Sequence, residues 1–137
     1  MEWQIEYLGL ILLVVIFAFF YAYKKLTNDP DALTSKHKEN RTYSNGTDDI
    51  GKLITKSLMN AGFKKVGFNS ELDRYFASAG MSLWSFGENI AVKVNPTAEG
   101  QEVQFASVCV FPTQIADWGK NKRNAKKFFT QLEALIG

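Results

Sequence analysis

The stretch LGLILLVVIFAFFYAY, residues 8–23, contains no charged side chain and decides how the rest of the chain is organised. Counted from Trp3, the apolar region has 21 residues, and a helix of that length would be about 31 Å long. The hydrocarbon core of a bilayer is about 30 Å thick. Trp3 and Tyr7 stand at one margin, and Tyr21 and Tyr23 at the other, where amphipathic rings favour the headgroup layer. The stretch therefore predicts a transmembrane helix that anchors everything after it.

Two other interpretations fit residues 1–25 less well than an uncleaved signal-anchor. A cleaved signal peptide begins with basic residues and ends at small ones, whereas Glu2 and Glu6 precede the apolar region and residues 19–23 are FFYAY. A buried core helix that is apolar on every face would need a much larger protein around it. We therefore expect a single-pass membrane protein.

The charges beside this helix predict its orientation. Lys24 and Lys25 follow it directly, and Lys36, Lys38 and Arg41 lie within or near the following zone of about 15–20 residues in which basic residues weigh most. The positive-inside rule then places the short N-terminus outside and the C-terminal domain in the cytoplasm.

The composition limits what the remainder of the chain can be. A net charge of +2 over 137 residues is too small to suggest nucleic acid as a partner. The single cysteine, Cys109, excludes an intramolecular disulfide, and the single histidine, His37, excludes a His-rich metal site. We expect neither a metal nor a cofactor.

Residues 26–47 predict a polar, flexible linker. They contain Pro30 and Gly46 and show neither helical nor strand periodicity. His37, between two lysines in this segment, is expected to be a solvated linker residue.

Residues 48–137 predict one soluble domain. Apolar residues recur at helical spacing from Ile50 to Ala61, after a capping Thr47 and before a terminating Gly62. A last helix with an apolar face begins at Asp117 or one turn earlier. Between the two helices we expect four strands, at residues 65–68, 74–79, 81–94 and 101–111.

The short turns between these strands favour antiparallel pairing. The predicted fold class is therefore α+β, in the order helix, four antiparallel strands, helix, with both helices on one face of the sheet.

The last helix carries a cluster of basic residues in its N-terminal half, where the helix dipole disfavours cations. The cluster consists of Lys120, Lys122, Arg123, Lys126 and Lys127. A solvated face is the plain interpretation of such a cluster. The functional interpretation is contact with anionic lipid headgroups, worth about 1 kcal/mol per basic residue near the surface.

A second candidate surface is the stretch MSLWSFGE, residues 81–88. If Trp84 and Phe86 share an uncovered strand face near Glu88, they form a platform for a partner or ligand. The alternative is that both rings are covered by a helix or by the linker. Glu88, next to Gly87, could then be a strand-edge carboxylate with a structural salt bridge. We expect no Cys/His pair, because His37 lies in the expected linker and Cys109 in a strand that should be buried. No phosphate-binding glycine loop opens either helix, so we assign no catalytic residue.

The stretch SVCVFPTQIADWGKNKRNAKKFF, residues 107–129, resembles the end of small uncharacterised bacterial α+β domains. The S-x-W-S-F-G-E stretch at residues 82–88 is also similar to these domains, so that the resemblance covers about the last 55 residues. In those domains a last strand enters a D-x-G-x-N-x-[KR] turn that opens the C-terminal helix, and Asp117, Gly119, Asn121 and Arg123 occupy the motif positions here. The resemblance implies a bacterial protein, and thus the inner membrane, but no activity. Physically, Asp117 could cap the helix, Gly119 could allow close backbone approach, and Asn121 could tie the turn to a strand end.

The leading hypothesis is a bacterial membrane-anchored protein whose domain is a non-enzymatic binding module at the membrane surface. Its expected partners are the bilayer itself and either anionic headgroups or an unidentified protein, with nucleic acid not expected. The alternative is a membrane-tethered enzyme or small-ligand-binding domain that uses the Trp84–Glu88 surface. A cleft near Trp84, Glu88 and Trp118 would favour the alternative.

Overall fold

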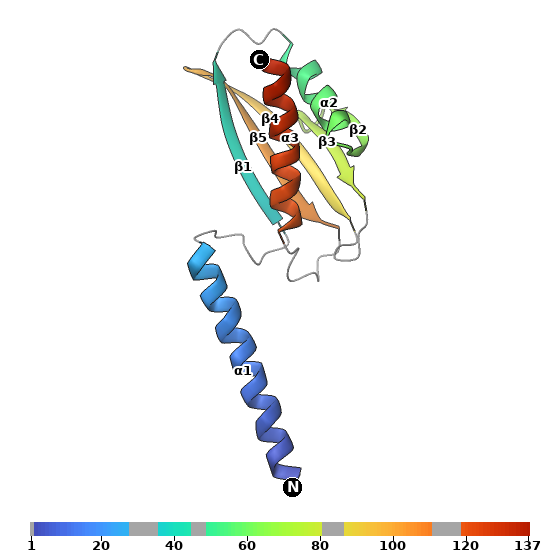
Figure 1. Ribbon diagram of the computed structural model, residues 1–137. Coiled ribbons are helices and arrows are strands. Elements are labelled where there is room, and N and C mark those ends of the chain that lie inside the picture. The colour runs from blue at the N-terminus through green and yellow to red at the C-terminus, as the bar shows by residue number, and fades with distance from the viewer. Residues whose placement is uncertain (1, 28–35, 45–48, 81–86, 111–118) are drawn as a thin grey trace.

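The computed structural model describes residues 2–27, 36–44, 49–80, 87–110 and 119–137 (Figure 1). The three helices are α1 (Glu2–Thr27), α2 (Ile50–Asn60) and α3 (Lys120–Ile136). The five strands are β1 (Lys36–Ser44), β2 (Lys64–Asn69), β3 (Arg74–Ala79), β4 (Glu88–Thr97) and β5 (Gly100–Cys109). The predicted α+β class with an antiparallel sheet is confirmed, and the prediction of four strands is wrong.

The strands form one antiparallel sheet in the order β1-β5-β4-β3-β2. Lys36 pairs with Val108, and Glu88 pairs with both Cys109 and Ala79. These pairings bring the start of β1, the start of β4 and the end of β5 to the same end of the sheet. We call it the tether end, because β1 there is the first strand after α1 (Figure 1). The turns at the opposite, far end are those between β2 and β3 and between β4 and β5.

The fifth strand, β1, lies inside the predicted linker 26–47 and corrects that prediction. Its sequence KHKENRTYS alternates between exposed and half-buried side chains, but only one of them, Tyr43, is strongly apolar. The strand is held by its pairing with β5 and by Arg41, whose guanidinium lies 4.4 Å from the centre of the Phe129 ring. Edge strands are commonly polar, which is why hydrophobic periodicity missed this one. His37 therefore lies in a strand, with Nε2 3.4 Å from a Glu39 carboxylate oxygen.

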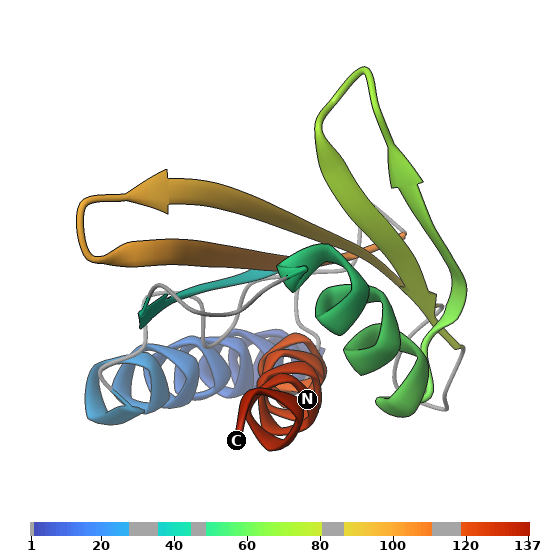
Figure 2. The ribbon, with the colours of Figure 1, turned by 90° about the horizontal axis from the view of Figure 1, so that it is seen from above.

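The helices α2 and α3 lie side by side on one face of the sheet (Figure 2). α3 packs over β5 and β1, and α2 packs over β2 and β3. Between them and the sheet, the rings of Phe105, Phe128 and Phe129 lie with centroids 5.0–6.0 Å apart; Phe105 stacks on Phe128, and Phe129 meets Phe128 edge to face. The other fully buried apolar side chains come from both helices and the central strands: Ile54, Leu58, Ile90, Val92, Val103, Ala125 and Leu132.

The termini of both helices use left-handed backbone. Asp49 caps α2 and accepts a hydrogen bond from the Lys52 backbone N–H. Gly119, with φ of 75°, precedes α3 and its carbonyl accepts from the Arg123 N–H. The capping residues expected from the sequence, Thr47 and Asp117, lie outside the described residues.

α1 takes no part in the hydrophobic core. Its large apolar side chains from Tyr7 to Tyr23 are exposed, with Phe20 half-buried. Among the residues that the structure describes, no helix combines the length and the apolarity needed to cross a membrane.

Candidate functional site

The structure divides the predicted basic cluster of α3 into two parts. Lys122, Arg123, Lys126 and Lys127 are exposed along the helix. The Lys120 side chain is only 15% exposed, and its Nζ lies 3.1 Å from Glu88 Oε2. The same ammonium group donates to the Gly80 carbonyl oxygen at 2.8 Å. Lys120 therefore belongs to the packing of α3 on the sheet, and we remove it from the set of candidate lipid contacts.

The exposed part of the cluster borders a groove between α3 and the end of α2. Arg123, Lys126 and Lys127 line it on one side, and Asn60 and Ala61 line it on the other. The groove has a volume of about 520 Å³.

Beneath the start of α3 lies a buried polar cluster: Glu88, Ser107, Asn121 and Asn124. Ser107 donates its hydroxyl hydrogen to Asn121 Oδ1 at 2.6 Å, and Asn124 Nδ2 donates to Ser107 Oγ at 3.2 Å. Asn124 Nδ2 also lies 3.4 Å from Glu88 Oε2. These bonds tie the first turns of α3 to β4 and β5, since buried polar groups are retained where they are hydrogen-bonded.

Glu88 is thus fully buried and is not part of an exposed surface with Trp84 and Phe86. Its ion pair with Lys120 agrees with the alternative expectation of a structural salt bridge at the strand edge. The alternation of β4 explains the difference, because Glu88, Ile90 and Val92 all face the helices. Trp84, Phe86 and Asp117 lie outside the described residues. Asn121 does reach a strand end, through Ser107 and through Cys109 Sγ at 3.5 Å.

Charge is distributed unevenly between the two ends of the domain. The exposed cations at the tether end come from β1, β2 and α3: Lys36, Lys64, Lys65, Lys122 and Arg123. Of the described carboxylates, only Glu88 lies at that end, and it is buried against Lys120. The far end instead carries more exposed carboxylates than cations. The carboxylates are Asp49, Glu71, Asp73, Glu99 and Glu133, and the cations are Lys52, which pairs with Asp49, Arg41, which pairs with Glu133, and the exposed Arg74. Sequence order scatters these residues, so this polarity becomes visible only once the strand register is known.

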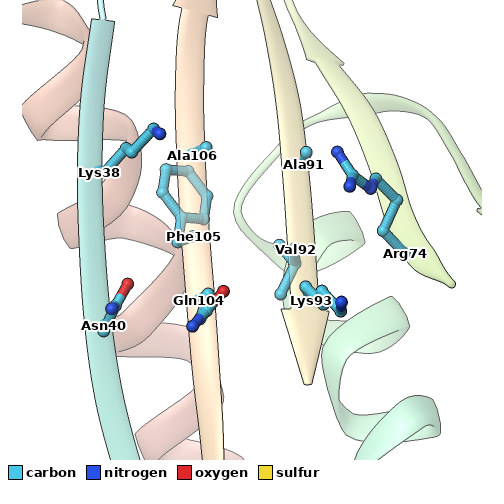
Figure 3. A pocket seen from close by; sticks show the side chains of 9 residues that line it. All are labelled: Lys38, Asn40, Arg74, Ala91, Val92, Lys93, Gln104, Phe105 and Ala106. Atoms are coloured by element: carbon cyan, nitrogen blue, oxygen red, sulfur yellow. The ribbon is translucent and has the colours of Figure 1, made fainter. Parts of the chain in front are cut away.

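The sheet face opposite the helices carries a second basic region. Lys38 of β1, Lys93 of β4 and Arg74 of β3 surround a pocket of about 410 Å³ (Figure 3). The cross-strand neighbours Ala91 and Ala106 form its floor. The alternation of β4 predicts from the sequence that Lys93 and Ala91 share one face of the sheet. Lys38 joins them at the pocket only because β1 pairs with β5.

The described residues contain no group of His, Cys, Asp and Glu side chains that could hold a metal ion. The Cys109 thiol is buried. No protein-family model, curated protein or solved structure matches the chain. The resemblance of residues 107–129 to bacterial domains therefore stays a hypothesis.

Proposed function

We propose that this chain is a single-pass protein of the bacterial inner membrane, whose α+β domain is a non-enzymatic binding module on the cytoplasmic membrane surface. The observation that carries the proposal is the polarity of the domain, with exposed cations at the tether end and exposed carboxylates at the far end.

The anchor is supported by the uncharged stretch at residues 8–23 and by the exposure of its side chains in α1. Water-exposed apolar surface on this scale is rare in soluble proteins and indicates contact with a membrane or another protein. The basic residues that follow α1 support the cytoplasmic orientation.

The short connection between α1 and the domain strengthens the argument. Only residues 28–35 separate Thr27 from Lys36, so that the chain between them can extend at most about 30 Å. The 22-residue linker expected from the sequence would have let the domain move much further away. Because β1 starts at the tether end, the basic end of the domain is the part held closest to the bilayer.

The electrostatic attraction between the basic residues and an anionic leaflet is strong enough to orient a tethered domain. A basic residue near an anionic leaflet gains about 1 kcal/mol, and the attraction decays over a Debye length of about 10 Å. Several cations at the tether end can act together, whereas carboxylates at the far end are repelled. The attraction of the cations and the repulsion of the carboxylates favour the same orientation, with the tether end on the lipid headgroups.

The alternative function, an enzyme or ligand-binding domain on the Trp84–Glu88 surface, has less support. Its one described member, Glu88, is buried and paired with Lys120, so its carboxylate is not presented to a ligand.

Protease digestion of spheroplasts tests the proposed topology. A C-terminally tagged full chain should stay in the membrane fraction after alkaline carbonate extraction. Its domain should be protected in intact spheroplasts and digested after lysis. Digestion in intact spheroplasts would place the domain outside the cytoplasm. Extraction of the chain by carbonate would show that α1 does not anchor it in the membrane.

A further inference from the structure

The pocket between Lys38, Arg74 and Lys93, on the sheet face opposite α2 and α3, has a different construction from the basic surface at the tether end. Its floor is made by Ala91 and Ala106, which are direct cross-strand neighbours on β4 and β5. Lys38 pairs with Ala106 in the register of β1 and β5, so it borders the same row. Larger side chains at either alanine would fill the space, and the two small residues therefore create the pocket.

Positive side chains converge on this floor from opposite sides. Lys38 reaches over Ala106 from β1, and the Arg74 guanidinium reaches over Ala91 from β3 (Figure 3). Lys93 adds a third cation one step along β4. Within the described residues, none of the three makes an ion pair, and Arg74 donates only to the Leu72 carbonyl oxygen at 3.4 Å.

The polar side chains at the margin complete the lining. Asn40 and Gln104 both donate to the carboxylate of Glu102, at 3.4 Å and 2.8 Å. Glu102 itself is not among the lining residues. Its bonds to the two amides hold it at the edge, and the lining therefore contains three cations and no carboxylate.

We propose that this pocket binds a small organic anion carrying two acidic groups, either phosphates or carboxylates, one near Lys38 and the other near Arg74 and Lys93. A guanidinium can form paired hydrogen bonds to such a group, and lysine supplies a compact charge beside it. The volume of about 410 Å³ lies in the range of small-molecule sites, roughly 300–1,000 Å³. The alanine floor accommodates the body of the ligand between the two acidic groups.

The experiment titrates the ¹⁵N-labelled full chain, in a non-ionic detergent without phosphate, with pyrophosphate and separately with citrate. We expect at least one probe to shift the backbone amides of Ala91, Lys93, Gln104 and Ala106 with saturation below about 10 mM. Absence of saturable shifts with both probes, or shifts that centre on α3, would overturn the proposal.

Two kinds of variant separate a built pocket from general charge attraction. The triple substitution Lys38→Gln, Arg74→Gln and Lys93→Gln should weaken binding by about tenfold or more. Ala91→Leu with Ala106→Leu keeps every charge but fills the pocket, and should weaken binding as strongly. The charge-matched control, Lys56→Gln with Lys126→Gln and Lys127→Gln, should change affinity less than twofold. Unchanged binding in the alanine variant would contradict the proposal even if the charge variant folds poorly.

A last arm distinguishes a soluble anion from a lipid headgroup. The full chain is placed in nanodiscs of phosphatidylcholine alone or with phosphatidylglycerol, without soluble anion. The pocket amides should not respond to phosphatidylglycerol. If they respond to that lipid and to neither soluble probe, the small-anion proposal is wrong.

Discussion

Lys120 Nζ lies 3.1 Å from Glu88 Oε2, which joins the first turn of α3 to the first residue of β4. The pair sits at the tether end, where every other described cation is exposed. It therefore has a structural role distinct from that of the basic surface around it, because it orders the helix that presents Lys122 and Arg123.

Breaking this pair should destabilise the domain. Glu88→Gln leaves the Lys120 ammonium without its anion at a site where the glutamate is fully buried. Loss of one partner of a buried pair costs about 3–5 kcal/mol, and the partial exposure of Lys120 favours the lower limit. Urea unfolding of the full chain, followed by circular dichroism, measures the change. Lys64→Gln, at an exposed cation of the same end, should change the free energy of unfolding by less than about 0.5 kcal/mol.

The buried side-chain amide of Asn121 should also stabilise the domain. Asn121→Ala leaves the Ser107 hydroxyl without its acceptor at 2.6 Å, and a buried polar group that loses its partner costs about 1–3 kcal/mol. The substitution Lys126→Ala, at an exposed position of the same helix, should be near neutral, since alanine favours the helix. Equal unfolding midpoints for the two variants would show that the polar cluster does not hold α3 in place.

Gly100 is required for β1 to pair with β5. Its φ is 149°, and a Cβ at this position would collide with the Tyr43 carbonyl oxygen. Gly100→Ala should therefore destabilise the domain by about 1–3 kcal/mol and speed amide exchange in β1. Gly80→Ala is the matched control, because its Cβ would meet no atom within 4 Å. Slow exchange in β1 of the Gly100 variant would contradict the assigned pairing.

The far end contains a pH-dependent contact between β1 and α3. Arg41 Nη1 donates to Glu133 Oε1 at 2.6 Å, and this bond lowers the pKa of Glu133 against the opposing effect of desolvation. A bond from the Tyr43 hydroxyl at 3.1 Å lowers the pKa further. Because the folded pKa is below the unfolded one, the stabilisation is present above about pH 4.5 and is lost as the pH falls through the folded pKa.

The comparison of Glu133→Gln with the unmodified chain measures this effect. The difference in unfolding free energy should be small, since Glu133 is exposed to solvent, and should shrink between neutral pH and about pH 3. In an Arg41→Met background the same substitution should show a weaker pH dependence. If the difference in unfolding free energy grew as the pH fell, it would contradict a lowered pKa of Glu133 in the folded protein.

Much of the domain follows from local sequence patterns. The helical spacing from Ile50 predicts α2, and the predicted strand at residues 74–79 coincides with β3. In both segments the apolar residues recur with a regular spacing, and residues typical of turns lie at the ends. β1 has neither, and its position depends on pairing with β5, whose partner residues are 56 (Ser44 and Gly100) to 72 (Lys36 and Val108) positions away in the chain.

The candidate sites were harder to predict for the same reason. The basic residues of α3 are visible in the sequence, but the pairing of Lys120 with Glu88 depends on how α3 crosses β4. The pocket on the open face brings together Lys38, Arg74 and Lys93 from three strands. Their approach is a property of the register, which local periodicity does not determine.

The most direct test of the proposed membrane orientation is the depth of the two domain ends in nanodiscs with phosphatidylglycerol. An environment-sensitive fluorophore is attached to Lys122→Cys at the tether end or Glu99→Cys at the far end, with the unmodified chain as the labelling blank, because Cys109 is buried. We predict that spin-labelled headgroups quench the label at position 122 and leave the label at position 99 unquenched. Combined Arg123→Gln, Lys126→Gln and Lys127→Gln substitutions should reduce the quenching. Equal quenching at both positions, or stronger quenching at position 99, would contradict a domain held with its basic end on the membrane.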